Sequence, residues 1–252
     1  MNKEPKGFLD KKEISTPQEI FMNKFQLKEP IEQIKSYYIV NQKDIKLTIQ
    51  DDDDYYPLHQ MIYLKNLNYI KFIVENLPNK NSDINCIDSI GNTPLHIAVT
   101  LKNTEEIINY LLQQGADINI KNKKNQTPLH LACGKNRLEN VNILLSNPKI
   151  DYNVIDSQGF TPLIKACASQ SYDVVKSLIR SNEVKLNIQD LIGNTAMHYL
   201  CEDEKYEMAI LLIKAGADYN IKNKEEKTPI DKIKTDDIKN IIVSYIKNNL
   251  EK

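Results

Sequence analysis

A tetrapeptide that returns at a fixed interval limits what this chain can fold into. Thr93-Pro94-Leu95-His96 returns intact at Thr127-Pro128-Leu129-His130, and an earlier copy without the threonine runs from Tyr56 to His59. Altered copies begin at Thr161, Thr195 and Thr228. The five threonines are 34, 34, 34 and 33 residues apart. Such a period indicates stacked helical repeats that contact only their neighbours, so we expect a long binding surface, not a catalytic cleft.

The interval from Asp88 to Lys121 shows how local chemistry divides one repeat. Asp88 to Asn92 has the composition of a turn, after which Thr93 suits a helix N-cap and Pro94 suits the first helical position. Apolar residues then recur at helical spacing in two short stretches, and Gly115 can end the second one with a positive φ. Helices this short are marginal alone, so the repeats must stack to bury their apolar faces.

Composition sets limits on the class of partner. The chain has 252 residues, of which 41% are hydrophobic and 27% are charged, with a formal net charge of −1. This balance gives no general reason to expect nucleic-acid or membrane binding. The first twelve residues lack the apolar region of a signal peptide, and no apolar run approaches the ~18 residues that span a bilayer.

Three of the four cysteines lie six residues after the threonine of their repeat. Cys133, Cys167 and Cys201 are spaced one repeat apart, so we expect them to be small buried hydrophobic residues. There is no Cys-x-x-Cys pair and no disulfide framework, and reduced thiols suit the cytoplasm and the nucleus.

Residues that carry catalysis or bind metals elsewhere occupy repeated positions here. His59, His96, His130 and His198 share one slot of the repeat, whereas a catalytic base needs no copy in every unit. The sequence contains neither a glycine-rich phosphate loop nor a metal-ligand spacing, so it predicts a non-enzymatic protein without a cofactor.

The acidic run from Asp51 to Asp54 is best interpreted as a solvated loop; metal binding and contact with a basic partner are the alternatives.

Two charged clusters lie at equivalent positions, just after the first helix of their repeats. One is Lys135-Asn136-Arg137 and the other, two repeats later, is Glu202-Asp203-Glu204. Charges at such positions commonly only solvate a helix end. In a stacked array, however, two clusters of opposite sign favour a partner with the reversed pattern of charge.

The repeated Thr-Pro-Leu-His, together with Gly115-Ala116-Asp117 and Gly216-Ala217-Asp218, resembles the ankyrin repeat. The resemblance implies an all-α solenoid of about seven helix-turn-helix repeats with short β-hairpin fingers. It also implies that the shared histidine ties each repeat to its neighbour by hydrogen bonds. The residues given this structural role are Thr93, Pro94, His96, Thr127, Pro128, His130, His59 and His198.

The period and the resemblance together place the boundaries along the chain. We expect a disordered N-terminus over residues 1–16 and a degenerate capping repeat over 17–50. About three residues are inserted near Leu77 to Ser82, in the second repeat. The remaining repeats are predicted at 51–87, 88–121, 122–155, 156–189, 190–222 and, as the C-terminal cap, 223–252.

The C-terminal third is similar to the gankyrin family, ankyrin-repeat chaperones that assemble the 26S proteasome regulatory particle. The resemblance rests on Asn223-Lys224-Glu225-Glu226-Lys227-Thr228-Pro229, on Asn187 to Asp190 and on Lys135 to Arg137. It implies that the concave face binds the C-terminal domain of a proteasomal ATPase subunit of the regulatory-particle base, and that the free protein is a monomer. The partner-binding residues implied by the resemblance are Lys135, Arg137, Asp53, Asp88, Glu202, Asp203 and Glu204.

A second hypothesis remains open at this point. A generic ankyrin adaptor, or an inhibitor of a transcription factor or cell-cycle kinase, has the same fold, so the fold alone does not decide between them. The stretches 223–229 and 135–137 favour the assembly chaperone, but the sequence does not select one ATPase subunit.

Overall fold

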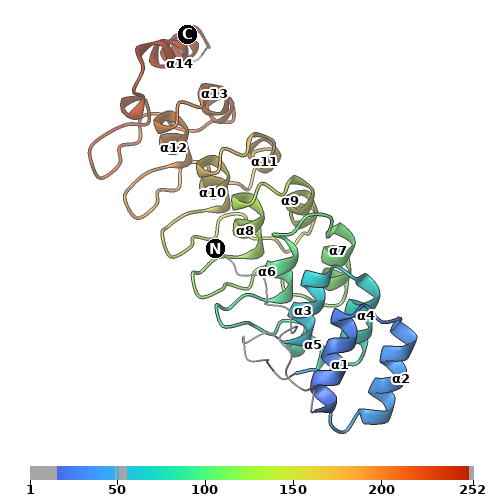
Figure 1. Ribbon diagram of the computed structural model, residues 1–252. Helices are drawn as coiled ribbons and strands as arrows, with labels where there is room; N and C mark the ends of the chain where they lie inside the picture. Colours follow the sequence, from blue (N-terminus) through green and yellow to red (C-terminus); the bar gives the residue numbers. More distant parts are fainter. Residues whose placement is uncertain (1–15, 49, 51–55, 250–252) are drawn as a thin grey trace. The chain divides into compact units, whose positions relative to one another are not determined.

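The computed structural model describes residues 16–48, 50 and 56–249, and in this part of the chain every regular element is a helix. The chain divides into two compact units, residues 1–123 and residues 124–252. Each unit is built from pairs of antiparallel helices joined to finger-like loops (Figure 1). The two units are described in turn.

The first unit consists of three helix pairs and one additional short helix. Each pair has an inner helix followed by an outer helix, and the inner helices α1, α3 and α6 contact one another in that order. The helices are α1 (Pro17–Gln26), α2 (Ile31–Asn41), α3 (Pro57–Leu64), α4 (Leu67–Glu75), α5 (Lys80–Asp83), α6 (Pro94–Ala98) and α7 (Glu105–Gln113).

An aromatic cluster closes the N-terminal end of the first unit. The rings of Phe21 and Phe25 from α1, Tyr38 from α2, and Tyr69 and Phe72 from α4 lie 5.0–6.4 Å from a neighbour, centroid to centroid. All five side chains are buried. Large rings bury much apolar area per residue, so this cluster allows a capping repeat without Thr-Pro-Leu-His to form a core.

The insertion predicted in the second repeat forms a helix. Residues Lys80–Asp83 make up α5, which begins after Asn79 and leads to the buried Ile84. The backbone amide of Asn79 donates a hydrogen bond to the Asp83 carboxylate at 2.8 Å, which closes this extra turn on itself. Of the N-terminus predicted to be disordered, residues 1–15 lie outside the described residues, and Thr16 is the N-cap of α1.

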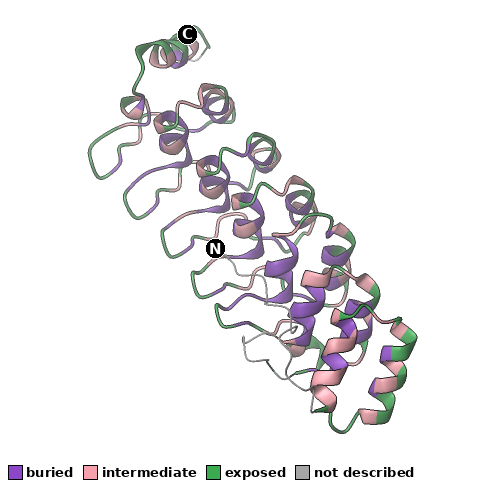
Figure 2. Ribbon diagram, viewed as in Figure 1, coloured by how far each residue is buried: buried purple, intermediate pink, exposed green. Residues whose placement is uncertain are grey.

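The second unit continues the same pattern over four repeats. Three helix pairs are followed by a 3-10 turn and a final long helix, and buried residues concentrate on the facing sides of the helices (Figure 2). The elements are α8 (Pro128–Gly134), α9 (Leu138–Leu145), α10 (Pro162–Ala168), α11 (Tyr172–Leu178), α12 (Ala196–Glu202), α13 (Tyr206–Lys214), η1 (Ile230–Lys232) and α14 (Asp236–Asn249). Cys133, Cys167 and Cys201 are fully buried, which confirms the expectation for them.

Threonine and histidine start the inner helices together. In three repeats the histidine Nδ1 accepts a hydrogen bond from the backbone amide of the threonine, at 3.0–3.1 Å (Thr93–His96, Thr127–His130 and Thr195–His198). Because Nδ1 is an acceptor, the neutral ring carries its proton on Nε2. The ring therefore replaces the glutamate of an ordinary capping box and keeps one N–H for another partner.

The free side of the histidine ring reaches the next finger. Nε2 of His59 lies 2.9 Å from the carbonyl oxygen of Asn92, 33 residues later. Nε2 of His130 lies 2.9 Å from the carbonyl of Phe160, and Nε2 of His198 lies 3.1 Å from that of Lys227. Each of these bonds fastens an inner helix to the loop of the following repeat.

The fingers differ from the β-hairpins expected from the family resemblance, because no strand is assigned among the described residues. Neighbouring fingers share single backbone hydrogen bonds, such as Leu191 N to Gln158 O at 3.2 Å and Lys224 N to Ile192 O at 3.1 Å. One bond for each pair of loops is too few for a β-ladder. Side-chain amides add to the stacking: Asn223 Nδ2 donates to Asn194 Oδ1 at 2.8 Å.

The glycines of the second unit give a graded test of this arrangement. Gly159 has φ +79°, and a Cβ there would lie 2.7 Å from the Leu191 amide nitrogen, so Gly159→Ala combines backbone strain with a clash. Gly216 has φ +94°, and a Cβ there would have no atom within 4 Å; Gly134 is helical and has equally open surroundings.

In urea denaturation we expect Gly159→Ala to lower the free energy of unfolding by about 2 kcal/mol or more, and Gly216→Ala by about 1 kcal/mol. Gly134→Ala should raise it by up to about 1 kcal/mol. Equal losses at positions 159 and 216 would contradict the close approach of the two fingers.

The histidine links predict a dependence of stability on pH. Burial lowers the pKa of His59 from 6.5 to about 4, although its hydrogen bond to Asn92 acts in the opposite direction. The unfolded chain therefore takes up a proton first as the pH falls, and stability is lost between pH 6.5 and pH 4. We expect His59 to account for about 3 kcal/mol of this loss. Denaturation at several pH values should show a shallower slope for His59→Gln, whose amide does not titrate; an unchanged slope would contradict the assignment.

Candidate partner-binding surface

Each finger of the second unit begins with an aspartate or asparagine that holds the loop. One carboxylate oxygen of Asp156 accepts from the amides of Gln158 and Phe160 at 2.9 and 3.0 Å. Asp190 and Asn223 repeat this geometry with the residues two and four positions later. The three residues are 34 and 33 positions apart, a periodic signal that the sequence analysis did not use.

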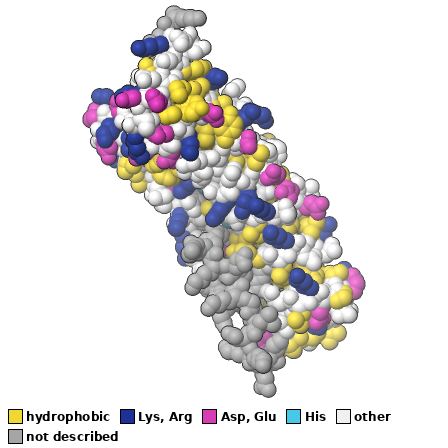
Figure 3. Space-filling view, turned by 45° about the horizontal axis from the view of Figure 1, so that its top comes forward, with side chains coloured by type: hydrophobic (Ala, Val, Ile, Leu, Met, Phe, Trp, Pro, Cys, Tyr) yellow, Lys and Arg dark blue, Asp and Glu magenta, His cyan; other side chains and the backbone are white. Residues whose placement is uncertain are grey.

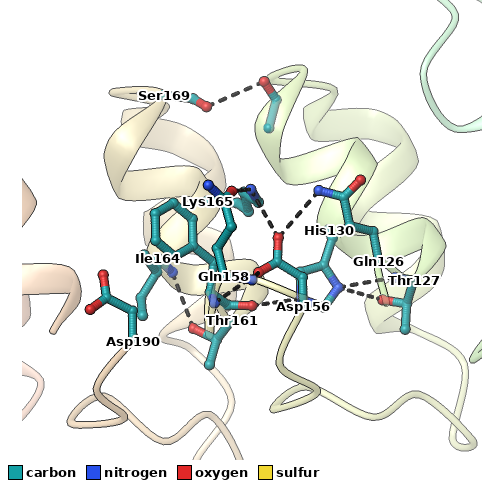
Figure 4. Close-up of polar contacts among 12 residues, drawn as sticks. Gln126, Thr127, His130, Asp156, Gln158, Thr161, Ile164, Lys165, Ser169 and Asp190 are labelled. Atoms are coloured by element: carbon teal, nitrogen blue, oxygen red, sulfur yellow. Dashed lines mark hydrogen bonds and ion pairs between the residues drawn. The ribbon is translucent and has the colours of Figure 1, made fainter. Parts of the chain in front are cut away.

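Lys165 forms a different connection in the repeat that lacks the histidine. Ile164 stands in the histidine slot of α10, and the next residue, Lys165, places Nζ 3.0 Å from the second carboxylate oxygen of Asp156 (Figure 4). The same ammonium group lies 3.3 Å from Gln158 Oε1 and 4.5 Å from the centroid of the Phe160 ring. This helix is thus joined to its own finger by an ion pair and a cation–π contact.

The Asp156 carboxylate is buried but well compensated. Burial raises its pKa, yet hydrogen bonds from Lys165 and from the amides of Gln158 and Phe160 outweigh that effect and hold the pKa below its usual value. Gln126 Nε2 also donates to this carboxylate at 3.3 Å. The finger of the fifth repeat is therefore fixed from several sides, and it holds Phe160 in place.

Two aromatic side chains meet on the inner face of the second unit. The rings of Phe160 and Tyr199 are 5.3 Å apart in an edge-to-face arrangement, and both side chains are half-buried. Tyr199 lies 34 residues after Lys165, in the same position of the next inner helix, and its hydroxyl donates to Asp190. Burial and this hydrogen bond raise the pKa of Tyr199, so its hydroxyl stays protonated and donates.

Exposed aliphatic side chains lie on the two fingers to which Phe160 and Asp190 belong. Leu191 is 61% exposed, Ile192 57% and Ile155 49%. The hydrogen bond between Leu191 N and Gln158 O places the sixth finger beside the fifth. Hydrophobic side chains also lie exposed next to charged ones of both signs on the face shown in Figure 3. We call the set of residues Ile155, Phe160, Leu191, Ile192 and Tyr199, which belong to the fifth and sixth fingers and to α12, the inner patch.

The basic residues inferred from the sequence lie at the end of α8. Lys135 follows this helix and is exposed, whereas Arg137 is half-buried and precedes α9. In the next repeat the Ser169 hydroxyl donates to the Gly134 carbonyl at 3.3 Å, which places an exposed uncharged residue beside Lys135.

The acidic residues of the sixth repeat are not equally accessible to a partner. Glu202 pairs with Lys232 at 3.3 Å, and Glu204 accepts the Thr235 amide at 2.9 Å. Asp203 is exposed and receives one bond, from Gln170 Nε2 at 3.2 Å. Of the three carboxylates, Asp203 is thus the best placed to meet an external cation.

The two acidic residues assigned to the early fingers have different outcomes. Asp53, with the rest of the Asp51–Asp54 run, lies outside the described residues. Asp88 is 5% exposed, and its carboxylate accepts from the amides of Ile90 and Asn92 at 3.1 and 2.7 Å. Burial raises the pKa of Asp88 despite these bonds. Because it holds its own finger, we leave Asp88 out of the proposed contact surface.

The cysteines of the inner helices are buried and protonated. Burial raises the pKa of Cys201 to about 12 and likewise raises those of Cys133 and Cys167, so these thiols stay protonated. Among the described residues, no group of three or more His, Cys, Asp or Glu side chains is placed to hold a metal ion. None of the described helices is long and apolar enough to cross a lipid bilayer.

Comparison with protein families agrees with this geometry. The family model for three copies of the ankyrin repeat matches residues 28–122, 102–190 and 149–223. This chain belongs to the ankyrin-repeat family. The overlapping matches run from the aromatic N-terminal cap to the finger of the seventh repeat, and they identify the molecule as a protein-binding scaffold.

A solved ankyrin structure shows the same fold. The crystal structure of the ankyrin-repeat domain of Bcl-3, described as a unique member of the IkappaB protein family, has a TM-score of 0.78 with this chain. The likeness covers 92% of this chain and 100% of that domain at 21% sequence identity, so it concerns the fold alone. No curated protein sequence matches this ankyrin-repeat chain significantly.

The Lys165–Asp156 pair can be tested by a double-mutant cycle. Lys165→Met keeps most of the aliphatic chain and removes the charge, and Asp156→Asn keeps the shape of the carboxylate. Because Asp156 is buried and Lys165 is 17% exposed, we expect a coupling energy of about 1–3 kcal/mol in urea denaturation.

The exposed Lys222–Glu226 pair, at 3.4 Å, is the matched control in the same unit. Its coupling energy should stay below about 0.5 kcal/mol because solvent screens both charges. Similar values for the two pairs would show that the Lys165 link contributes no more than an ordinary surface ion pair.

Proposed function

We propose that this ankyrin-repeat protein is an assembly chaperone of the 26S proteasome regulatory particle. In this proposal it binds the C-terminal domain of one ATPase subunit of the base. Support comes from the resemblance of residues 223–229 and 135–137 to the gankyrin family. The observation that carries the proposal is the order of charge along the ends of the inner helices of the second unit.

That order runs from positive through neutral to negative. Lys135 is exposed after α8, Ser169 and Gln170 are exposed after α10, and Asp203 is exposed after α12. A folded partner with an acidic and a basic site two repeats apart would be oriented by this surface. Charges of this kind mainly set specificity and association rate.

The inner patch supplies the apolar part of the contact. Tyrosine and other aromatic residues dominate binding energy where they lie at the centre of an interface and exclude water. Phe160 and Tyr199 are held rigidly by Lys165 and Asp190, so little side-chain entropy is lost when a partner covers them. Leu191 and Ile192 extend the patch onto an exposed finger.

The mechanism in this proposal is steric shielding. The surface of the ankyrin protein covers one face of the ATPase domain and blocks premature docking until assembly proceeds. The interface combines charged and apolar groups, so affinity should fall as salt is added, because the Debye length is about 8 Å at physiological ionic strength. The scheme needs no catalytic residue and no cofactor.

We place the protein in the cytoplasm and nucleus, as a monomer when it is free. The four described cysteines are unpaired, which agrees with a reducing compartment. Protein partners, rather than nucleic acid or membrane, fit the net charge of −1.

A second candidate function is that of an adaptor or inhibitor of a signalling protein such as a transcription factor. The observation that favours it is the fold shared with the ankyrin domain of Bcl-3, a member of the IkappaB family. A signalling partner would use the same inner patch, so the two candidates differ in the partner and not in the surface.

Binding to purified ATPase C-terminal domains tests the proposal directly. We expect one of these domains to bind, and Lys135→Glu to weaken binding about tenfold, mainly through slower association. Leu191→Asp should weaken it at least as much through loss of apolar contact. Lys176→Glu and Tyr172→Asp, at exposed positions of the outer helix α11, are the controls and should leave binding unchanged.

The readout is surface plasmon resonance, with a thermal melt of each variant to verify folding. If none of the ATPase domains binds, the chaperone proposal fails. Binding of a signalling protein that is lost in Leu191→Asp would then support the second candidate.

A further inference from the structure

The first unit carries a row of lysines at the ends of its inner helices. Lys28 follows α1, Lys65 follows α3, and Lys102 lies in the loop after α6. They are separated by 37 and 37 residues, and all three are exposed. None of them forms an ion pair with another residue in the part of the chain that the structure describes. We call Lys28, Lys65 and Lys102 the lysine edge.

The backbone gives no reason for lysine at two of these positions. Lys28 and Lys65 have φ of 56° and 54°, the left-handed region in which a side chain is strained. Asparagine tolerates that conformation better, and Asn103 (φ 58°) and Asn136 (φ 50°) occupy it in the loops of the next two repeats. The backbone conformation therefore does not account for lysine at positions 28 and 65, and the charge of the side chains is the feature to be explained.

A hollow opens between the first two lysines. It has a volume of about 570 Å³ and is lined by Lys28, Lys65, Asn66, Asn68 and Glu106, among others. Glu106 is the one carboxylate in this lining. Glu29, the residue next to Lys28, is already paired with Lys24 at 2.8 Å. With two lysines and one carboxylate in its lining, the hollow has a surplus of positive charge.

The spacing of the lysines points to a regular partner. Packed helices lie about 8–10 Å apart, and α1, α3 and α6 contact one another in order. Lys28 and Lys65 share the left-handed position and therefore start about one such step apart, and Lys102 lies one residue before that position in the next repeat. Residues seven positions apart on a straight α-helix are about 10.5 Å apart on one face. Carboxylates placed at that interval would meet the lysines one by one.

We propose that the lysine edge is a second docking surface, which binds an acidic α-helix of a partner protein. Carboxylates one heptad apart pair with Lys28, Lys65 and Lys102, and the first of them reaches the hollow. The helix lies across the ends of the inner helices. This contact is independent of the proposed function, because the inner patch belongs to the second unit.

Synthetic helical peptides provide the probe for the full-length protein. One peptide carries three glutamates roughly seven residues apart in a neutral helical sequence. A second has the same composition, with the glutamates in consecutive turns. By fluorescence anisotropy at low salt, we expect the first to bind at least about fivefold more tightly, because only its carboxylates match the repeat.

Charge variants identify the surface. Lys28→Glu, Lys65→Glu and Lys102→Glu combined should weaken binding of the first peptide by at least about tenfold. Lys43→Glu, Lys46→Glu and Lys80→Glu combined make the same change of charge at other exposed positions of the unit and should have little effect. An asparagine triple variant at 28, 65 and 102, which suits the left-handed backbone at 28 and 65, guards against misfolding and should also lose binding.

Other outcomes would overturn the proposal. Equal binding of the two peptides, or equal loss in the edge and control variants, would mean general electrostatic attraction. Vesicles with anionic lipid and a single-stranded RNA are run in parallel. If either binds more tightly than the peptide and loses binding in the edge variants, the lysine edge serves a membrane or RNA instead of an acidic helix.

Discussion

The bond from a histidine of one repeat to the finger carbonyl of the next is the interaction on which the stacking depends. One ring makes two hydrogen bonds: in His130, Nδ1 accepts from the backbone amide of Thr127, at the start of the helix, and Nε2 donates to the carbonyl of Phe160 in the neighbouring loop. Nδ1 can accept only in the neutral imidazole, and burial favours the neutral form by lowering the pKa of His130, as it does that of His59. Helix start, repeat contact and pH sensitivity are therefore consequences of the same side chain, and its recurrence as His59, His96, His130 and His198 needs no catalytic explanation.

The repeat in which Ile164 replaces the histidine contributes to the inner patch. With Ile164 in the histidine slot, α10 is tied to its finger by Lys165, and that ion pair brings Phe160 against Lys165 and Tyr199. The repeat that lacks the histidine thus contains an ion pair between its helix and its own finger, and this ion pair lies beside the aromatic residues of the inner patch. A residue that departs from the repeated pattern makes contacts that occur in one repeat only. Such positions are therefore candidates for binding sites.

Charge at the ends of the inner helices distinguishes the two units. The first unit has three exposed lysines that form no ion pair with the described residues. In the second unit the exposed residues change from Lys135 through the uncharged Ser169 and Gln170 to Asp203. A stacked fold turns residues one repeat apart into neighbours on a surface, so single substitutions at one slot accumulate into a charge pattern without altering the core. Ankyrin repeats with the same fold can for this reason bind unrelated proteins.

The sequence by itself determined the repeat period, the threonine helix starts, the positive φ at Gly115 and the burial of Cys133, Cys167 and Cys201, because these depend on neighbours in the chain or on the period. Tertiary structure alone decided which charges remain available. Glu204 was one of three acidic candidates in the sixth repeat, but it accepts a hydrogen bond from the Thr235 amide, 31 residues away. Asp88, a candidate in an early finger, is buried in its own finger. The insertion became α5, and the fingers stacked without strands. Such outcomes depend on contacts about one repeat apart, which exist only after the helices have stacked and which no local pattern specifies.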